Sequence, residues 1–215
     1  GMDHAFSSAL RAIDNLLDQR DGGKPAVFIN TTVTKGNVES LGGILDLARS
    51  HKVDGMTLSV IQSVDTYSPD AEMTGIETSG LGRKLRELAT KSDGLIPHPE
   101  EYLDCFQTYL EKPSELYRYR CAAGYANAVV QPNGEVFPCP VAFASMGNLK
   151  EQSFKEIWYS RRSAEIRARI KANKHPICWF DCIAPLNVLL HNVRGLRIHK
   201  VLHRRTIAHI LRKTR

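Results

Sequence analysis

The chain has 215 residues, of which 42% are hydrophobic, and a formal net charge of +6. This length and hydrophobic content indicate an ordinary globular protein with one or two domains. No segment approaches the roughly 20 apolar residues that a membrane-spanning helix needs. The first 25 residues mix charged side chains into the apolar pattern, unlike a secretory signal. We therefore expect a cytoplasmic protein.

The predicted elements begin with an amphipathic helix at residues 3–20, which two glycines end. A β-branched run at residues 25–33 predicts a buried strand. Residues 37–52 predict a helix that Asn37 can cap, and residues 56–62 predict a second strand. Helix, strand, helix and strand with short connections form an α/β unit, which requires a parallel sheet covered by helices.

Polar side chains follow the first predicted strand at its carboxyl end, where parallel α/β sheets place their reactive groups. Thr32, Thr34 and Asn37 are therefore the candidate cofactor-binding residues of this sheet. Thr and Asn also serve solvated turns and helix caps. That local role is the interpretation we favour for these three residues.

Two further helices are predicted at residues 81–93 and 100–112, and Pro113 then closes the first domain. Cys105 lies in the second of these helices among aromatic and leucine side chains. A single cysteine in an apolar stripe usually packs in the core. We therefore do not count Cys105 as a metal ligand.

Cys121 and Cys139 bracket a segment that predicts a β-hairpin, because an Asn-Gly pair at residues 133–134 separates two alternating apolar runs. With this pair as the turn, Cys139 lies opposite Ala128. Gly124, in the loop after Cys121, permits a sharp return toward the same end of the hairpin. The two cysteines can therefore bind a common ligand.

A second pair of cysteines follows a predicted helix, for which Ser153 and Glu156 form a capping box. Pro176 ends this helix, and the sequence CWFDC then supplies Cys178 and Cys182. A reducing compartment disfavours disulfides, so the four cysteines favour a tetrathiolate metal site. Spacing alone leaves zinc and an iron–sulfur cluster equally open, with a disulfide within CWFDC as a third alternative.

The motifs Cys121, PNGEVFPC, GNL, SFKEIW and CWFDC follow one another in the chain. In this order they resemble the SPASM/twitch auxiliary-cluster domain of radical S-adenosylmethionine (radical SAM) enzymes over residues 121–182. The upstream helices and strands resemble the last part of the partial (β/α) barrel of those enzymes. The resemblance implies an auxiliary [4Fe-4S] cluster held by Cys121, Cys139, Cys178 and Cys182, beside an open barrel that binds substrate.

Two features depart from the family pattern. Twitch domains commonly end in two cysteines separated by two residues, whereas CWFDC has three. The 215 residues also lack the Cys-x-x-x-Cys-x-x-Cys motif, whose cluster binds and cleaves S-adenosylmethionine in the family. The resemblance therefore implies the carboxyl-terminal part of a longer enzyme, or a family member that lost catalysis, and in either case a chain that is not active alone.

Most of the positive charge lies at the carboxyl end. Residues 182–215 contain eight Lys or Arg and no acidic residue, which leaves 21 basic and 23 acidic residues in the remainder. From Leu186 onward, apolar and basic residues alternate in a pattern that predicts an amphipathic helix, with a break at Gly195. This helix could dock on its own chain, an anionic membrane surface or an acidic partner. Nucleic acid is less favoured, because no recognition motif accompanies the charge.

The expected fold is α/β, or α+β overall, in three parts: an incomplete (β/α) barrel segment at 2–112, a small β-hairpin plus helix SPASM/twitch-like domain at 113–185, and a basic amphipathic tail at 186–215. The cluster would relay electrons from a separate donor or position substrate. The missing amino-terminal half, self-association or an unusual local covering would protect the exposed sheet edge. The alternatives are a zinc-stabilised binding module and a basic adaptor for membrane or nucleic acid.

Overall fold

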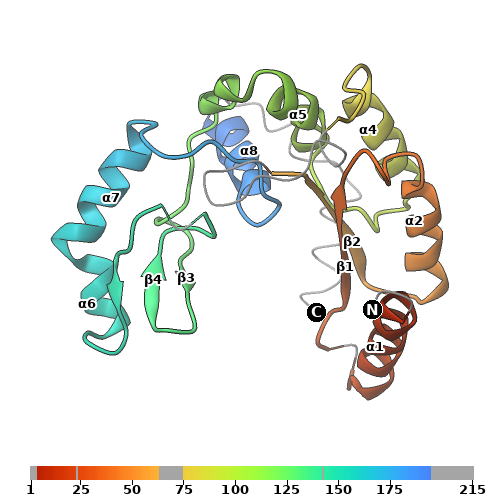
Figure 1. The fold of residues 1–215 in the computed structure, drawn as a ribbon, viewed down its shortest axis with the longest axis horizontal. Helices are drawn as coiled ribbons and strands as arrows, with labels where there is room; N and C mark the ends of the chain where they lie inside the picture. The colour runs from red at the N-terminus through yellow and green to blue at the C-terminus, as the bar shows by residue number, and fades with distance from the viewer. Residues whose placement is uncertain (1–3, 23, 63–74, 142, 195–215) are drawn as a thin grey trace. The chain divides into compact units, whose positions relative to one another are not determined.

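The computed structural model describes residues 4–22, 24–62, 75–141 and 143–194 (Figure 1). These residues belong to two compact units. Unit 1 contains the described residues up to 61 and from 75 to 104, and unit 2 contains residue 62 and the described residues from 105 onward. Both units mix helices with short strands, so the expected α+β class is confirmed. Within the described ranges, no helix is both long and apolar enough to cross a membrane.

Unit 1 has the predicted order of helix, strand, helix and strand, followed by two more helices. Its two strands pair in parallel and in register, from Phe28 opposite Gly55 to Val33 opposite Val60, as expected. The boundary between the units falls inside the last helix, after Asp104. The elements are α1 (Ala5–Gln19), β1 (Phe28–Val33), α2 (Leu41–Ser50), β2 (Gly55–Val60), α4 (Leu81–Lys91) and α5 (Glu100–Glu111).

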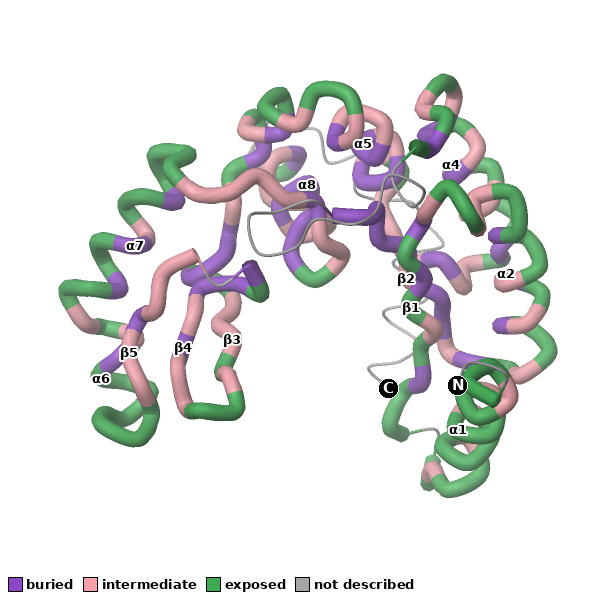
Figure 2. Tube along the Cα trace, in the orientation of Figure 1, coloured by how far each residue is buried: buried purple, intermediate pink, exposed green. Residues whose placement is uncertain are grey.

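The core of unit 1 lies between the strand pair and helices α2 and α4. Leu41 and Leu45 of α2, and Leu81 and Leu85 of α4, are all nearly fully buried. Each pair is spaced by four residues, which places both members on one helix face. Figure 2 shows buried positions along β2 and on these two helices. This packing confirms the prediction that helices cover a parallel sheet.

Helix α1 and strand β1 are more exposed than the sequence predicted. Helix α1 contains no buried residue, and Phe6 is 66% exposed and Leu16 53% exposed. Phe28, Asn30 and Thr32 of β1 are also exposed, so the prediction of a buried strand is wrong for half of its residues. In the described part of unit 1, the main core lies on the side of the strand pair that faces α2 and α4. The exposed residues of β1 therefore point away from this core.

The second edge of β2 is covered by a loop and by side chains. The Met56 amide donates to the carbonyl of Leu95 over 2.8 Å. The Leu58 amide donates to Nε2 of His98, and its carbonyl accepts from the Tyr102 hydroxyl, each over 2.8 Å. These contacts satisfy backbone groups that another strand would otherwise bind. The unusual covering of a sheet edge is thus present at β2, while β1 forms the other edge of the two-stranded sheet.

Among its described residues, and after the end of α5, unit 2 contains one 3-10 helix, an antiparallel sheet in the order β3-β4-β5, and three α-helices. The capping box at the start of α6 is confirmed, because Ser153 and Glu156 each bind the other's backbone amide. Hydrogen bonds from Ser153 lower the pKa of the Glu156 carboxyl. The elements are η1 (Pro113–Arg118), β3 (Val129–Val130), β4 (Glu135–Phe137), β5 (Gly147–Asn148), α6 (Phe154–Tyr159), α7 (Arg161–Lys171) and α8 (Ala184–Arg194).

The predicted hairpin forms, but its predicted register is wrong by one residue. Val129 pairs with Phe137. Extended by two residues, this register would place Asn127, rather than Ala128, opposite Cys139. Cys139 therefore lies two residues beyond the end of β4, and its position relative to the opposite strand differs by one residue from the prediction.

The shift arises because the turn has three residues instead of two. The Gly134 amide donates to the Gln131 carbonyl, and the Gln131 amide donates to the Glu135 carbonyl, both over 2.8 Å. Gly134 has a φ of +90°, a conformation that glycine adopts at little cost. A turn followed by a glycine bulge adds one residue to the loop, and this extra residue changes the pairing.

The helix predicted before Pro176 is divided into α6 and α7. Ser160 has φ −66° and ψ 157°, an extended conformation that ends α6. Its hydroxyl accepts a hydrogen bond from the Ser163 amide over 3.1 Å and so caps α7. The prediction of one continuous helix is therefore wrong. On α6, Ile157 is fully buried, whereas Phe154 is 45% exposed.

Helix α8 includes the first residues of the predicted amphipathic tail. The predicted break at Gly195 and the basic residues beyond it lie outside the described residues. Hypotheses that involve a membrane surface, an acidic partner or nucleic acid therefore stay predictions.

Candidate metal centre

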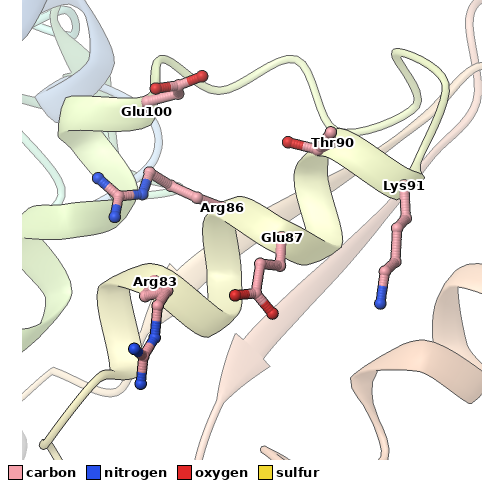
Figure 3. A pocket seen from close by; sticks show the side chains of 6 residues that line it. All are labelled: Arg83, Arg86, Glu87, Thr90, Lys91 and Glu100. Atoms are coloured by element: carbon pink, nitrogen blue, oxygen red, sulfur yellow. The ribbon is translucent and has the colours of Figure 1, made fainter.

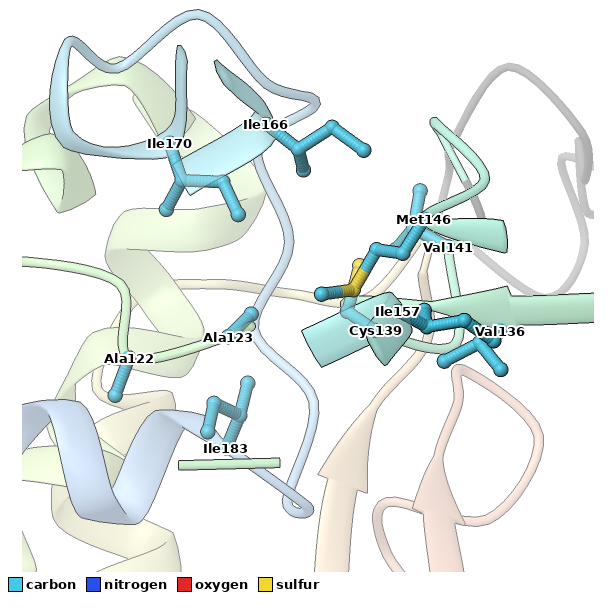
Figure 4. Packing of buried hydrophobic residues seen from close by; sticks show 10 residues of the cluster. All are labelled: Ala122, Ala123, Val136, Cys139, Val141, Met146, Ile157, Ile166, Ile170 and Ile183. Carbon is cyan, nitrogen blue, oxygen red and sulfur yellow. The ribbon is translucent and has the colours of Figure 1, made fainter. Parts of the chain in front are cut away.

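A hydrophobic core in unit 2 includes one candidate cysteine, Cys139 (Figure 4). Cys139 is 7% exposed and belongs to this core, while Cys121 and Cys178 pack against it. Three of the four candidate ligands thus contact one apolar cluster. Its other buried members are Ala122, Ala123, Val136, Val141, Met146, Ile157, Ile166, Ile170 and Ile183.

The loop after Cys121 turns back to the end of the hairpin, as predicted. The Gly124 amide donates to the carbonyl of Pro138, the residue before Cys139, over 3.1 Å. Gly124 has a φ of +72°, and a Cβ at this position would lie 3.1 Å from the Pro138 Cβ. Only glycine combines this backbone conformation with such a close approach at little cost. The turn brings the first two cysteines to the same end of the hairpin.

The second pair lies in the segment between α7 and α8. Trp179, which directly follows Cys178, is 1% exposed, and its amide donates to Oε1 of Gln62 over 2.9 Å. The amide of Ala184 donates to the carbonyl of Phe180 over 2.9 Å and begins the turn into α8. A buried anchor and a hydrogen-bonded turn therefore hold the segment that carries the second pair.

Both cysteines of the second pair have raised pKa values. Burial raises the pKa of Cys178 to about 12, and the charges of the other three candidate cysteines add to this rise. Burial, followed by the Asp181 carboxylate, raises the pKa of Cys182 to about 11, with smaller contributions from Cys139 and Cys121. The charge of one thiolate disfavours ionisation of the next, so neighbouring thiols favour their neutral forms.

The donor set fits a bound cation or cluster. Cys182 is exposed, while the other three thiols lie in or against the apolar cluster. Burial favours the neutral form of a thiol, and positive charge from a metal would stabilise the thiolates. Soft thiolate ligands suit iron–sulfur clusters and zinc. Among the residues that the structure describes, no three or more His, Cys, Asp or Glu side chains are placed to hold one metal ion. A [4Fe-4S] cluster places its thiolates on separate iron atoms, so its ligands need not converge on one ion.

The fifth cysteine is separate from this group. Cys105 is 1% exposed in α5, and its sulfur lies 3.5 Å from the hydroxyl of Tyr119. This burial confirms the expected packing role. All five cysteines carry free thiols in the structure, which contains no disulfide between Cys178 and Cys182.

The three candidate residues at the carboxyl end of β1 lie together in one turn of unit 1. Oδ1 of Asn37 accepts from the Thr34 amide over 2.9 Å, and its Nδ2 donates to the Thr32 carbonyl over 2.8 Å. The predicted helix cap is wrong, because α2 begins at Leu41 after Ser40 and the Asn37 side chain is engaged in this turn. The arrangement agrees with a local role for Asn37.

Unit 1 also has an open, charged hollow that no sequence motif predicted (Figure 3). Arg86 in this hollow forms an ion pair with Asp104 over 2.9 Å. Because basic and acidic side chains are mixed here, the hollow has no strong preference for a ligand of either charge. It is lined by Arg83, Arg86, Glu87, Thr90, Lys91 and Glu100.

Asn187 on α8 is the polar residue of the centre that sequence patterns missed. It is 6% exposed, and its Oδ1 accepts from the amide of Ala122 over 2.8 Å. Burial raises the pKa of the Cys121 thiol, and hydrogen bonding from the Ala123 backbone and the Asn187 side chain opposes this rise. The sequence signal for it is a single amide side chain within the apolar sequence LNVLL, at the start of the basic tail.

Comparison with protein families identifies one matching segment. Residues 121–183 match the model of SPASM, an iron–sulfur cluster-binding domain. The match contains all four candidate cysteines and excludes Cys105. No curated protein and no solved structure matches the chain.

Proposed function

We propose that the chain binds an auxiliary [4Fe-4S] cluster through Cys121, Cys139, Cys178 and Cys182. The observation that carries this proposal is the SPASM match over residues 121–183, which contains all four cysteines. The contact of Cys121, Cys139 and Cys178 with one apolar core supports it, as do the electrostatic interactions of Cys178 with the other three cysteines. The family match and the four thiol ligands together therefore favour a cluster.

We further propose that the site serves electron transfer. A bound cluster would accept and donate single electrons. Four cysteine thiolates would occupy all four irons and leave none open to a substrate, which favours electron relay over substrate positioning. The surrounding apolar side chains limit access of water and help to set the reduction potential. The electron donor would be a separate protein or reagent.

The chain would work as the carboxyl-terminal portion of a radical SAM enzyme, in which S-adenosylmethionine binds to the missing portion. Support comes from unit 1, where a loop and side chains cover the far edge of β2 while β1 forms the other edge. The exposed side chains of Phe6 and Leu16 on α1 would suit an amino-terminal half barrel or a second copy. The hydroxyls of Thr32 and Thr34 stay candidate ligand contacts in such an assembly.

Metal and sulfide analysis of the anaerobically purified chain tests the proposal. We expect about four iron and about four sulfide ions per chain after reconstitution, because all four thiolates serve one cluster. Stoichiometric zinc without sulfide would contradict this result and support a zinc-stabilised binding module. Treatment with an iron chelator under denaturing conditions provides the metal-free control.

A further inference from the structure

The orientation of the Asn187 side chain follows from its hydrogen bonds. Its Oδ1 is the acceptor for the Ala122 amide, over 2.8 Å. Ala122 directly follows Cys121, so this contact brings the Asn187 side chain to the ligand, and its amide nitrogen is the group that can donate to the Cys121 sulfur. The backbone amide of Ala123 also forms a hydrogen bond with this sulfur. Two N–H donors thus face one candidate ligand.

Helix α8 is held in place by the hydrophobic core of unit 2. Val188, the next residue, is 1% exposed, and Leu186 and Leu190 pack against the core cluster. These contacts fix the position of Asn187 beside Cys121. The segment that matches the SPASM model ends at residue 183, before α8 begins.

We propose that Asn187 is a positioning residue for Cys121 and that it raises the reduction potential of the cluster. This inference rests on the proposed function. Hydrogen bonds to ligand sulfurs are among the factors that set cluster potentials. N–H donors stabilise negative charge on sulfur, and reduction adds one negative charge to the cluster. The donors therefore stabilise the reduced form more than the oxidised form.

A redox titration of two matched variants, Asn187→Leu and Asn192→Leu, tests this role. Both substitutions remove a buried amide from α8, but Asn187 is the one whose side chain binds the Ala122 amide, next to Cys121. The midpoint potential of the reconstituted full chain is measured at fixed pH by electron paramagnetic resonance. We expect a shift to lower potential in Asn187→Leu and the wild-type potential in Asn192→Leu.

A second variant, Asn187→Asp, keeps an acceptor for the Ala122 amide but cannot donate to sulfur as a carboxylate. Its added negative charge should lower the potential further than Asn187→Leu does. Full iron content with the wild-type potential in both Asn187 variants would overturn the inference. Absence of a cluster from the wild-type chain would instead overturn the proposed function. Loss of iron from a folded Asn187→Leu chain, with iron retained in Asn192→Leu, would support the positioning role.

Discussion

Cys178→Ala is expected to abolish cluster binding. Iron and sulfide should fall from about four of each to less than about one per chain, because one of four protein ligands is lost. Cys178 is the most informative choice, since its pKa is raised by the charges of all three other candidate cysteines. The measurement is iron and sulfide content after identical anaerobic reconstitution of variant and wild-type chains.

Cys105→Ala is the matched control for this experiment. The substitution removes a buried thiol from the same unit, but Cys105 lies in α5 and contacts the hydroxyl of Tyr119. It should therefore retain the wild-type iron and sulfide content. Equal iron loss in Cys105→Ala and Cys178→Ala would show that the loss reflects general destabilisation instead of removal of a ligand.

Ile157→Ala should strongly destabilise unit 2. Ile157 is fully buried in the hydrophobic core of unit 2, and its Cγ1 would lie 2.9 Å from a Cβ added at Gly147. The substitution leaves a cavity in this tight contact, so the free energy of unfolding should fall by about 2–4 kcal/mol. We also expect faster loss of iron, because opening of the core exposes the cluster to solvent.

Tryptophan fluorescence can follow this unfolding selectively. The chain contains two tryptophans, and both Trp158 and Trp179 belong to unit 2. Val130→Ala provides the control, because Val130 is 51% exposed on the hairpin and its truncation should cost less than about 0.5 kcal/mol. Similar urea midpoints for Ile157→Ala and Val130→Ala would contradict the assignment of Ile157 to the core.

Local sequence patterns predicted the elements whose signals are short-range. Helical spacing located α2 and α4, and Ser153 with Glu156 correctly marked the start of α6. The β-branched runs located both parallel strands. Gly124 was correctly predicted to turn the Cys121 loop, because its conformational freedom is a local property.

The errors occurred where the outcome depends on a choice between two local structures or on distant contacts. Gly134 forms a glycine bulge instead of the second residue of a two-residue turn. Ser160 caps a new helix instead of continuing α6. Serine supports either outcome, since its hydroxyl can bind a nearby backbone group in both conformations. Asn187 was missed because its partner, Ala122, lies 65 residues earlier in the chain.

The Mössbauer spectrum of the chain reconstituted with ⁵⁷Fe tests the central claim most directly. We expect iron in a [4Fe-4S] cluster with thiolate ligands on all four irons, and no change when S-adenosylmethionine is added. Isolated iron sites, or a spectrum in which added S-adenosylmethionine alters one iron, would contradict a fully cysteine-ligated auxiliary cluster.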